Sequence, residues 1–231
     1  MNLKEAINLR RSIRRYLDVA IEQEKVDKLN EIIDELNKTL DLHIQLVLND
    51  TAVSTKNGKP KYGAFENAYN YFVLAGKRCK NLNEKLGYAG ECLALNCVTM
   101  GLGTCFVGMS YTNNKDKYSL EKDESLDLVL YVGYPNGTRG ARKSKTYEEV
   151  AKGVNVPDWF KDGVDAALKA PTALNQQKFS FEYVDGKVKA KYGLGVFTKT
   201  DLGIVKYNFE IGSGKDSSIW VNWYKISKLN L

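Results

Sequence analysis

Residues 126–135, LDLVLYVGYP, constrain the fold most, because they are apolar at successive positions rather than at alternate ones. A strand of this kind buries both of its faces, so we place it in the middle of a sheet. Two other short apolar runs predict further buried strands: NYFVLAG at 70–76 and TCFVGM at 104–109. The chain therefore builds at least one sheet that other elements must cover.

Helices to cover that sheet are predicted in the same half of the chain. In residues 25–40 the apolar side chains recur at spacings of three and four, which makes one face of an amphipathic helix. Residues 86–103, LGYAGECLALNCVTMGLG, are small or apolar on most faces and predict a packed central helix. Between the two, LHIQLVLND at 42–50 predicts a strand, and the polar residues 51–62 predict a loop.

A similar order of elements starts again near residue 150. PDWFKDGVDAALKA at 157–170 predicts a helix, and FSFEYVDGKVKAKY at 179–192 predicts a hairpin whose Asp185-Gly186 suits a type I′ turn. DLGIVKYNFEIGSG at 201–214 predicts another helix, and IWVNWYKIS at 219–227 a closing strand. The segments LGYAGECLAL and LGIVKYNFEI share a Leu-Gly start, which hints at an internal duplication.

Composition limits the kinds of chemistry. The N-terminal residues lack the pattern of a secretory signal, and the most apolar stretch, 92–109, is too polar to span a bilayer, so we expect a cytoplasmic protein. The four cysteines form no C-x-x-C pair or zinc spacing. The single histidine, His43, lies in an apolar run, and we expect a strand histidine with a satisfied side chain. Because so few side chains could act as catalysts, we favour chemistry that is carried out by a bound cofactor.

The arginines are concentrated in two short segments. The chain has 34 lysines and arginines and a net charge of +6, yet only seven of these residues are arginines. Four of the seven lie in NLRRSIRRY at 8–16, after a predicted helix, and two lie in GYPNGTRGARKSK at 133–145. Arginine binds phosphate oxygens through a planar fork, so this clustering indicates a fixed oxyanion partner. A solvated basic face and a nucleic-acid patch are the alternatives.

A third segment, APTALNQQKFSF at 170–181, follows the second-half helix. Its proline ends that helix, and its Asn and Gln side chains offer both donors and acceptors, as the edge of a heteroaromatic ring requires. Ordinary turn chemistry explains the same residues equally well.

Together these segments resemble the FMN-dependent nitroreductase family. RRSIRRY is similar to its R-R-S-x-R-x-[FY] segment, and APTALNQQKFSF to its A-P-S-x-x-N-x-Q-P-W-x-F segment, with Lys178-Phe179 in place of Pro-Trp. GECLALNCVTMGLGTCFVG resembles the central helix and following strand, and GYPNGTRGARKSKTYEEV resembles the closing G-Y-P…R-K segment. The resemblance covers the chain from Met1 to about Ile211.

The order of the segments departs from the usual pattern, since the Pro-Thr-Asn segment follows the G-Y-P segment instead of preceding it. This resembles a branch in which a shorter repeat follows the first within one chain. It implies an α+β, nitroreductase-like fold with a mainly antiparallel sheet flanked by helices, and a pseudo-dimeric single chain. Residues 1–150 form the first repeat and residues 151–231 the shorter second one, packed as one compact unit.

The resemblance assigns residues to the flavin. Arg10, Ser12 and Arg14, with Arg142 and Lys143, are expected to hold the phosphate, ribityl chain and ring edge. Arg11 is a further candidate, and Arg15 is expected to face away. The remaining expected contacts come from a strand end, from the second repeat and from a mid-chain loop: Phe106, Val107, Gly108, Pro171, Thr172, Asn175, Tyr62 and Gly63.

The implied activity is that of an oxidoreductase in which FMN takes electrons from NADH or NADPH and passes them to nitroaromatic, quinone or related acceptors. No side chain acts as a catalyst itself, and no metal is needed. The partners are small molecules, without nucleic acid or membrane, and the internal repeat allows a monomer. The alternative is an FMN-binding protein without NAD(P)H turnover, which serves flavin storage, sensing or breakdown.

Overall fold

A computed structural model describes residues 1–51, 65–108, 116–137, 140 and 143–221. The chain divides into two compact units. The sheet unit comprises Leu9–Leu82 and Leu93–Gly140, and the hairpin unit comprises Met1–Asn8, Asn83–Cys92 and Ala141–Asn230.

The sheet unit is built on four strands in the order β1-β2-β4-β3, and all neighbouring strands are antiparallel. Its strands are β1 (Gln45–Val47), β2 (Asn70–Lys77), β3 (Gly103–Gly108) and β4 (Glu124–Gly133). Strand β4 lies between β2 and β3, and its last six residues are buried. The prediction that the apolar run at 126–135 is a central strand is therefore confirmed.

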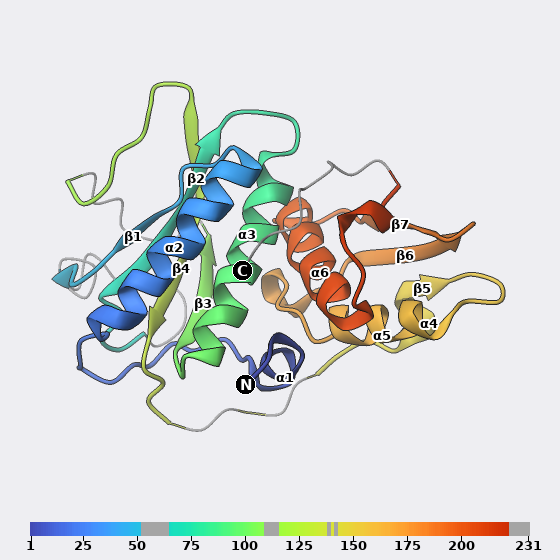
Figure 1. The fold of residues 1–231 in the computed structure, drawn as a ribbon, viewed down its shortest axis with the longest axis horizontal. Coiled ribbons are helices and arrows are strands. Elements are labelled where there is room, and N and C mark those ends of the chain that lie inside the picture. The colour runs from blue at the N-terminus through green and yellow to red at the C-terminus, as the bar shows by residue number, and fades with distance from the viewer. Residues whose placement is uncertain (52–64, 109–115, 138–139, 141–142, 222–231) are drawn as a thin grey trace. The chain divides into compact units, whose positions relative to one another are not determined.

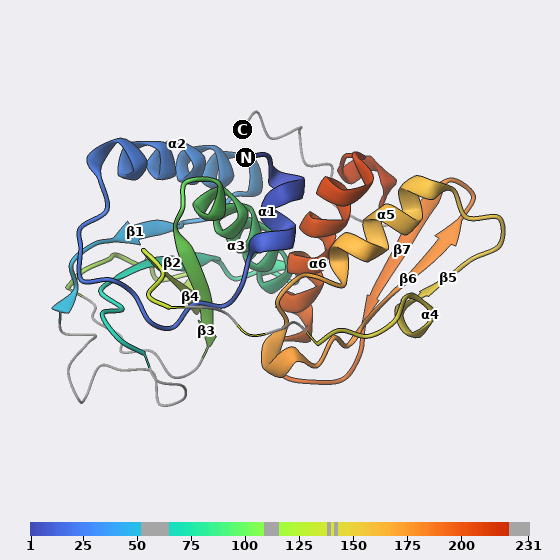
Figure 2. The ribbon, with the colours of Figure 1, turned by 90° about the horizontal axis from the view of Figure 1, so that it is seen from below.

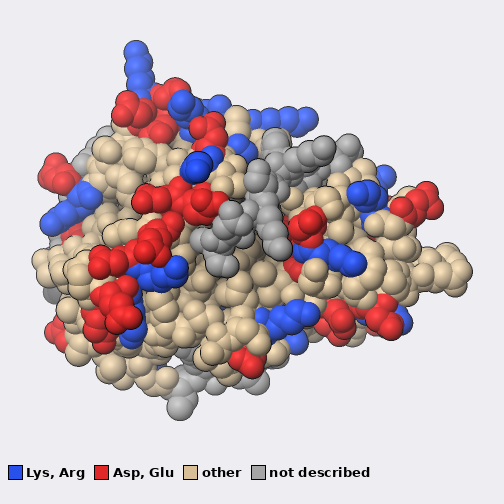
Figure 3. Space-filling model, in the orientation of Figure 1, with Lys and Arg blue, Asp and Glu red and all other residues tan. Residues whose placement is uncertain are grey.

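Helices cover one face of this sheet. Figures 1 and 2 show α2 (Gln23–Leu40) and the last turns of α3 (Leu82–Thr99) on the same side of it. Helix α2 turns a buried stripe inward, as the spacing in 25–40 predicts, and the structure adds one member to it, Ile32. Exposed acidic side chains follow the opposite side of α2, as Figure 3 shows: Glu24, Asp27, Glu31 and Asp34.

On the other face of the sheet, the described residues that pack against it come from irregular chain. Ile13 and Tyr16 from the arginine-rich N-terminal segment, together with Phe65, pack onto this face in one buried cluster. The strands contribute alternate residues to the cluster, including Tyr71 and Tyr131, which lie opposite each other in the register of β2 and β4. The arginine segment is therefore part of the core layer.

The hairpin unit combines helices with a small sheet in the order β5-β6-β7. Its elements are α4 (Tyr147–Val150), β5 (Ala151–Lys152), α5 (Asp158–Ala167), η2 (Ala173–Asn175), β6 (Phe179–Val184), β7 (Lys187–Tyr192), α6 (Thr198–Ser213) and η3 (Ser217–Ile219). Strands β6 and β7 form the predicted hairpin, and Asp185 and Gly186 at its turn both have positive φ, as a type I′ turn requires. Phe160, Phe181 and Phe209 meet in its aromatic core.

Within the hairpin unit, the start of α3 and α6 approach each other at two glycines. A Cβ atom on Gly87 of α3 would collide with the carbonyl oxygen of Thr200 on α6, and a Cβ atom on Gly203 of α6 would collide with that of Glu84 on α3. Thr200 and Glu84 each precede the glycine of their own helix by three residues. The contact is therefore reciprocal between the two helices.

The predicted α+β class, with an antiparallel sheet flanked by helices, is confirmed. The predicted closing strand at 219–227 is wrong at its start, because Ile219 ends the 3-10 helix η3 and Trp220 makes only an isolated bridge to Val188; its residues from 222 onward lie outside the described part. The predicted loop at 51–62 lies outside it except for Thr51. No helix among the described residues is long and apolar enough to cross a membrane. The predicted repeats, 1–150 and 151–231, stay a prediction.

Candidate functional site

The arginine segment leaves helix α1 (Leu3–Leu9) and runs in extended form against β3. The amide of Ile13 donates a hydrogen bond of 2.8 Å to the carbonyl oxygen of Thr104, and the amide of Tyr16 donates one of 3.0 Å to Glu66. The hydroxyl of Tyr16 closes the segment by donating to the carbonyl oxygen of Ile13 at 2.7 Å. Two buried side chains thus anchor the segment and fix the direction of the arginines between and before them.

The arginines differ in exposure. Arg10 is buried, with a relative exposure of 6%, whereas Arg14 and Arg15 are exposed. Burial raises the pKa of the Cys105 thiol on β3 to about 11, and the positive charges of Arg14 and Arg10 oppose that rise. Both guanidinium groups therefore lie close enough to the first half of β3 to act on a buried thiol there. The guanidinium of Arg11 donates to the carbonyl oxygen of Arg10 at 2.9 Å.

Strand β3 lies at the edge of the sheet. The backbone N–H and C=O groups of its successive residues point alternately toward β4 and toward the outer edge. The backbone of Thr104 points toward the arginine segment, because Thr104 forms a parallel β-bridge with Ser12 of that segment. Because backbone direction alternates along an antiparallel strand, Phe106 and Gly108 direct their backbone groups to the same outer edge. Val107 instead faces β4 with its backbone and places its side chain in the buried cluster.

In the hairpin unit, the predicted Pro-Thr-Asn segment forms a tight bend at residues 170–177 (the 170–177 bend). Leu174, Asn175 and Gln177 all have positive φ, at 52°, 52° and 45°. Asp201, in the first turn of α6, accepts hydrogen bonds of 2.9 Å from the amide of Ala173 and from the side-chain amide of Gln176. Asp201 is buried, and burial raises the pKa of its carboxyl group to about 6.

The 170–177 bend is also joined to the lysine-rich segment after the G-Y-P motif. The side-chain amide of Asn175 donates to the carbonyl oxygen of Lys143 at 3.2 Å, so two residues expected at the flavin lie together. The side chain of Gln177 accepts from the amide of Lys145 at 2.7 Å and donates to the carbonyl oxygen of Leu168 at 2.9 Å. Gln177 therefore has a structural role, in agreement with the turn-chemistry alternative.

The structure groups the expected flavin residues in two sets. The sheet unit contains the arginine-segment and strand-end residues: Arg10, Arg11, Ser12, Arg14, Phe106, Val107 and Gly108. The hairpin unit contains Lys143, Pro171, Thr172 and Asn175. Tyr62, Gly63 and Arg142 lie outside the described residues. Their assignment to FMN stays a prediction.

Sequence reasoning missed the residues that hold these segments in place. Tyr16 was visible as the aromatic position of the R-R-S-x-R-x-[FY] motif, and its period-three distance from Ile13 is a signal for a buried pair. Asp201 offered only a weak signal, an acidic residue in the first turn of a predicted helix. Nothing local in the sequence connects it to a bend almost thirty residues earlier.

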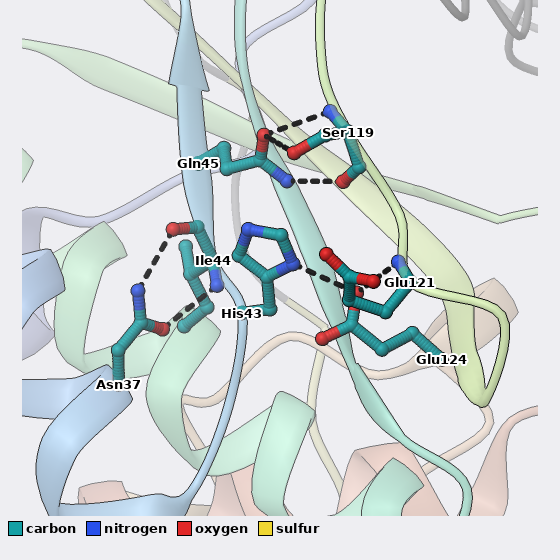
Figure 4. A network of polar contacts seen from close by, with 7 residues as sticks. All are labelled: Asn37, His43, Ile44, Gln45, Ser119, Glu121 and Glu124. Atoms are coloured by element: carbon teal, nitrogen blue, oxygen red, sulfur yellow. Dashed lines mark hydrogen bonds and ion pairs between the residues drawn. The ribbon is translucent and has the colours of Figure 1, made fainter.

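The single histidine is satisfied, as expected. Figure 4 shows its ring directed at Glu124, with Nδ1 of His43 2.7 Å from the carboxylate of that residue. The residue precedes β1 and donates its backbone amide to Ala75, so it borders the sheet rather than a reactive site. Two surface hollows among the described residues of the hairpin unit, of about 330 and 660 Å³, are lined by none of the expected flavin residues.

Comparisons with known proteins agree on one family. The family model described as "Putative TM nitroreductase" matches residues 2–213. A "putative nitroreductase" of Thermotoga maritima MSB8 is 20% identical, with a TM-score of 0.63, over 92% of this chain and 83% of that one. A search of curated proteins found no match.

Two further solved structures share the fold over a smaller part of this chain. An "FMN-dependent Nitroreductase" of Clostridium difficile R20291 is 20% identical, with a TM-score of 0.50, over 65% of this chain and 98% of that one. A "Putative NADH dehydrogenase/NAD(P)H nitroreductase" of Parabacteroides distasonis ATCC 8503 is 21% identical, with a TM-score of 0.52, over 68% and 99%. At these identities the likeness concerns the fold.

Proposed function

Because this chain belongs to the nitroreductase family whose model matches residues 2–213, we propose that it is an FMN-containing oxidoreductase that uses NADH or NADPH. Its acceptors are nitroaromatic compounds, quinones or related electron-poor molecules. The name of the C. difficile relative supports FMN, and that of the P. distasonis relative supports NAD(P)H. The stronger support comes from the donors that this chain itself brings together.

The observation that carries the proposal is the position of Arg10 and Arg14 beside β3. The amide of Ile13 donates to the carbonyl oxygen of Thr104 at 2.8 Å, and Ser12 forms a parallel bridge with Thr104, so the arginine segment lies along the edge strand β3. The positive charges of Arg14 and Arg10 also lower the pKa of Cys105 on that strand, in agreement with this position. The hydroxyl of Ser12 adds a neutral donor between them in sequence. Guanidinium forks fit phosphate oxygens, and the outward backbone of Phe106 and Gly108 suits a planar ring with donors and acceptors at its rim. This donor set fits FMN.

When bound, FMN supplies hydride and electron transfer, so the protein needs only to bind, orient and tune it. In this proposal Arg10, Ser12 and Arg14 hold the phosphate and ribityl groups, and the further flavin contacts are Lys143, Pro171, Thr172 and Asn175. A fixed positive charge near the ring stabilises negative charge that develops there. Such a site requires no histidine, and the one histidine of the chain is bonded to Glu124.

The tandem-repeat architecture is supported by the reciprocal glycine contact. In a twofold interface, residue i contacts residue j of the partner, and j contacts i. The same reciprocity is present within this one chain: Gly87 contacts Thr200, and Gly203 contacts Glu84, at equivalent positions of α3 and α6. The element order also repeats as helix, antiparallel strand pair and helix: α2, β1, β2 and α3, then α5, β6, β7 and α6. In this proposal the internal repeat supplies a pseudo-dimer, so that a monomer is possible.

The proposal is tested by loading the purified chain with FMN, removing free flavin, and mixing the complex anaerobically with NADH or NADPH. Loss of the visible flavin absorption, and its recovery when a quinone or nitroaromatic compound is added, is the expected result. A protein that retains FMN but leaves it oxidised with both donors would instead be a flavin-binding protein without turnover. A protein that retains no FMN would contradict both functions.

A further inference from the structure

We propose that Asp201 is the positioning residue that fixes the 170–177 bend, and that its ionised carboxylate thereby controls how tightly the chain binds FMN. The inference rests on the proposed function, in which Pro171, Thr172 and Asn175 contact the flavin. Asp201 contacts the bend and acts through it.

The bend has an unfavourable backbone conformation that packing does not offset. Leu174 and Asn175 are consecutive residues with positive φ, a region that residues with a Cβ atom rarely adopt, and leucine least readily of the two. The side chain of Leu174 is 92% exposed, so its burial contributes nothing to holding this shape. Polar contacts must therefore keep the bend in place.

The carboxylate of Asp201 is bonded on both sides of the two left-handed residues. Its Oδ1 accepts from the amide of Ala173, just before them, and its Oδ2 accepts from the side chain of Gln176, just after them. Asp201 is itself 3% exposed and lies in the first turn of a buried helix of 16 residues. One rigid carboxylate thus spans the strained pair.

The state of ionisation of Asp201 matters for these bonds. Burial raises its pKa to about 6, and the bonds from Ala173 and Gln176 oppose the rise. The lysines on the same helix have other partners: Lys199 lies 6.0 Å over the ring of Tyr192, and Lys206 lies 2.7 Å from Glu84. A protonated carboxyl group turns one acceptor oxygen into a donor, which opposes one of the two N–H groups. Burial favours the neutral acid, whereas the two N–H bonds from the bend favour the carboxylate, so the contact between Asp201 and the bend is firmest where the group is ionised, above about pH 6.

The first experiment compares FMN dissociation constants of the wild-type chain and Asp201→Asn between about pH 5 and about pH 8, where the carboxyl group titrates. The ratio of the two constants cancels the titration of the FMN phosphate, which occurs in the same range. We expect a ratio near one at the acid end, and an Asp201→Asn variant that binds about tenfold more weakly at the alkaline end. A ratio that stays constant with pH would overturn the inference.

Asp185→Asn is the matched control, because it removes the same charge from an exposed residue of the same unit that also has positive φ. Asparagine tolerates that conformation, so this variant should follow the wild type at every pH. If Asp201→Asn does not fold, Gln176→Met removes the same bond from the other side. It should weaken FMN binding at the alkaline end and flatten the pH dependence, and an unchanged dependence would again overturn the inference.

The second experiment needs no flavin. Hydrogen exchange of residues 170–177, corrected for intrinsic rates, should become faster in the wild type as the pH falls through 6, and should be fast throughout in Asp201→Asn. Equal protection in both proteins at all pH values would contradict the positioning role. If exchange behaves as expected and the wild type binds no FMN, the proposed function fails while the role of Asp201 in the bend remains.

Discussion

The hydroxyl of Tyr16 donates a 2.7 Å hydrogen bond to the carbonyl oxygen of Ile13, and this contact closes the arginine segment over the sheet. Both residues are buried, and the two residues between them, Arg14 and Arg15, are exposed. Residues 13–16 thus form a short arch: its two end residues are buried in the core, and its two middle residues expose positive charge to solvent. Its shape depends on packing beneath it as much as on the arginines.

Removal of that hydroxyl should weaken the arch. Tyr16→Phe leaves the carbonyl oxygen of Ile13 without its donor in a buried place, which we expect to lower the free energy of unfolding by about 1–2 kcal/mol. Chemical denaturation measures the change. Tyr192→Phe, at an exposed ring, is the control and should change stability by less than about 0.5 kcal/mol. Equal effects of the two variants would show that the buried bond is unimportant.

The reciprocal glycine contact predicts two matched effects. Gly87→Ala and Gly203→Ala each force a Cβ atom against a backbone carbonyl of the opposite helix, so each should destabilise the protein by about 2–3 kcal/mol or prevent folding. Gly193→Ala is the control, because a Cβ atom there meets its nearest neighbours at 3.6 Å. Thermal unfolding of the three variants compares them. A mild effect at only one of the two helix glycines would contradict the pseudo-twofold crossing.

Much of the fold follows from hydrophobic patterns that are local in sequence. The run at 126–135 predicted its central strand because its apolar residues from Leu128 to Val132 occupy both faces of the strand, and Asp185-Gly186 predicted its hairpin because few residues adopt that turn. Hydrophobic patterns could not show that Ile219 belongs to a 3-10 helix instead of the predicted closing strand. The helix η3 depends on a polar contact, in which the side chain of Asp216 accepts a hydrogen bond from the amide of Ser218. In the candidate site, the motif pointed to the arginines, whose role at the flavin stays a prediction, and it could not point to Asp201, which bonds to a bend distant in the sequence.

The hydrogen-bonded contact between His43 and Glu124 in Figure 4 predicts a pH effect on stability. Burial raises the pKa of Glu124, but the hydrogen bonds from His43 and from the amide of Glu121 outweigh it, so the net pKa is lowered. A lowered pKa means stability that is present above the ordinary value and is lost as the pH falls through the folded value. Glu124→Gln should therefore cost about 1–2 kcal/mol near neutral pH, and the cost should shrink toward about pH 3.

Denaturation of both proteins at several pH values measures this difference. Glu121→Gln is the matched control, because it changes an exposed side chain and retains the backbone amide that bonds to Glu124. It should leave the pH dependence of the wild type intact. A difference between Glu124→Gln and the wild type that does not change with pH would contradict the assignment.

The strain at Leu174 predicts a stabilising substitution. Leu174→Gly relieves a left-handed conformation that costs a leucine about 1–2 kcal/mol, while it loses about 0.5–1 kcal/mol in chain entropy, so the net gain should reach about 0.5–1 kcal/mol. Leu194→Gly is the control, since that leucine is equally exposed, at 93%, without positive φ, and it should be neutral or destabilising. The free energy of unfolding of the two variants decides. A Leu174→Gly protein less stable than Leu194→Gly would show that the bend is not strained.

The central claim, that the arginine segment binds FMN, is tested most directly by titrating FMN into the wild type, Arg14→Ala and Arg15→Ala. The two arginines are neighbours and both exposed, and of these two Arg14 is the one whose charge lowers the pKa of Cys105 on β3. We expect the wild type to bind FMN, Arg14→Ala to bind about tenfold more weakly or worse, and Arg15→Ala to remain within about twofold. A wild type that takes up no FMN, or an Arg14→Ala variant with unchanged affinity, would contradict the account.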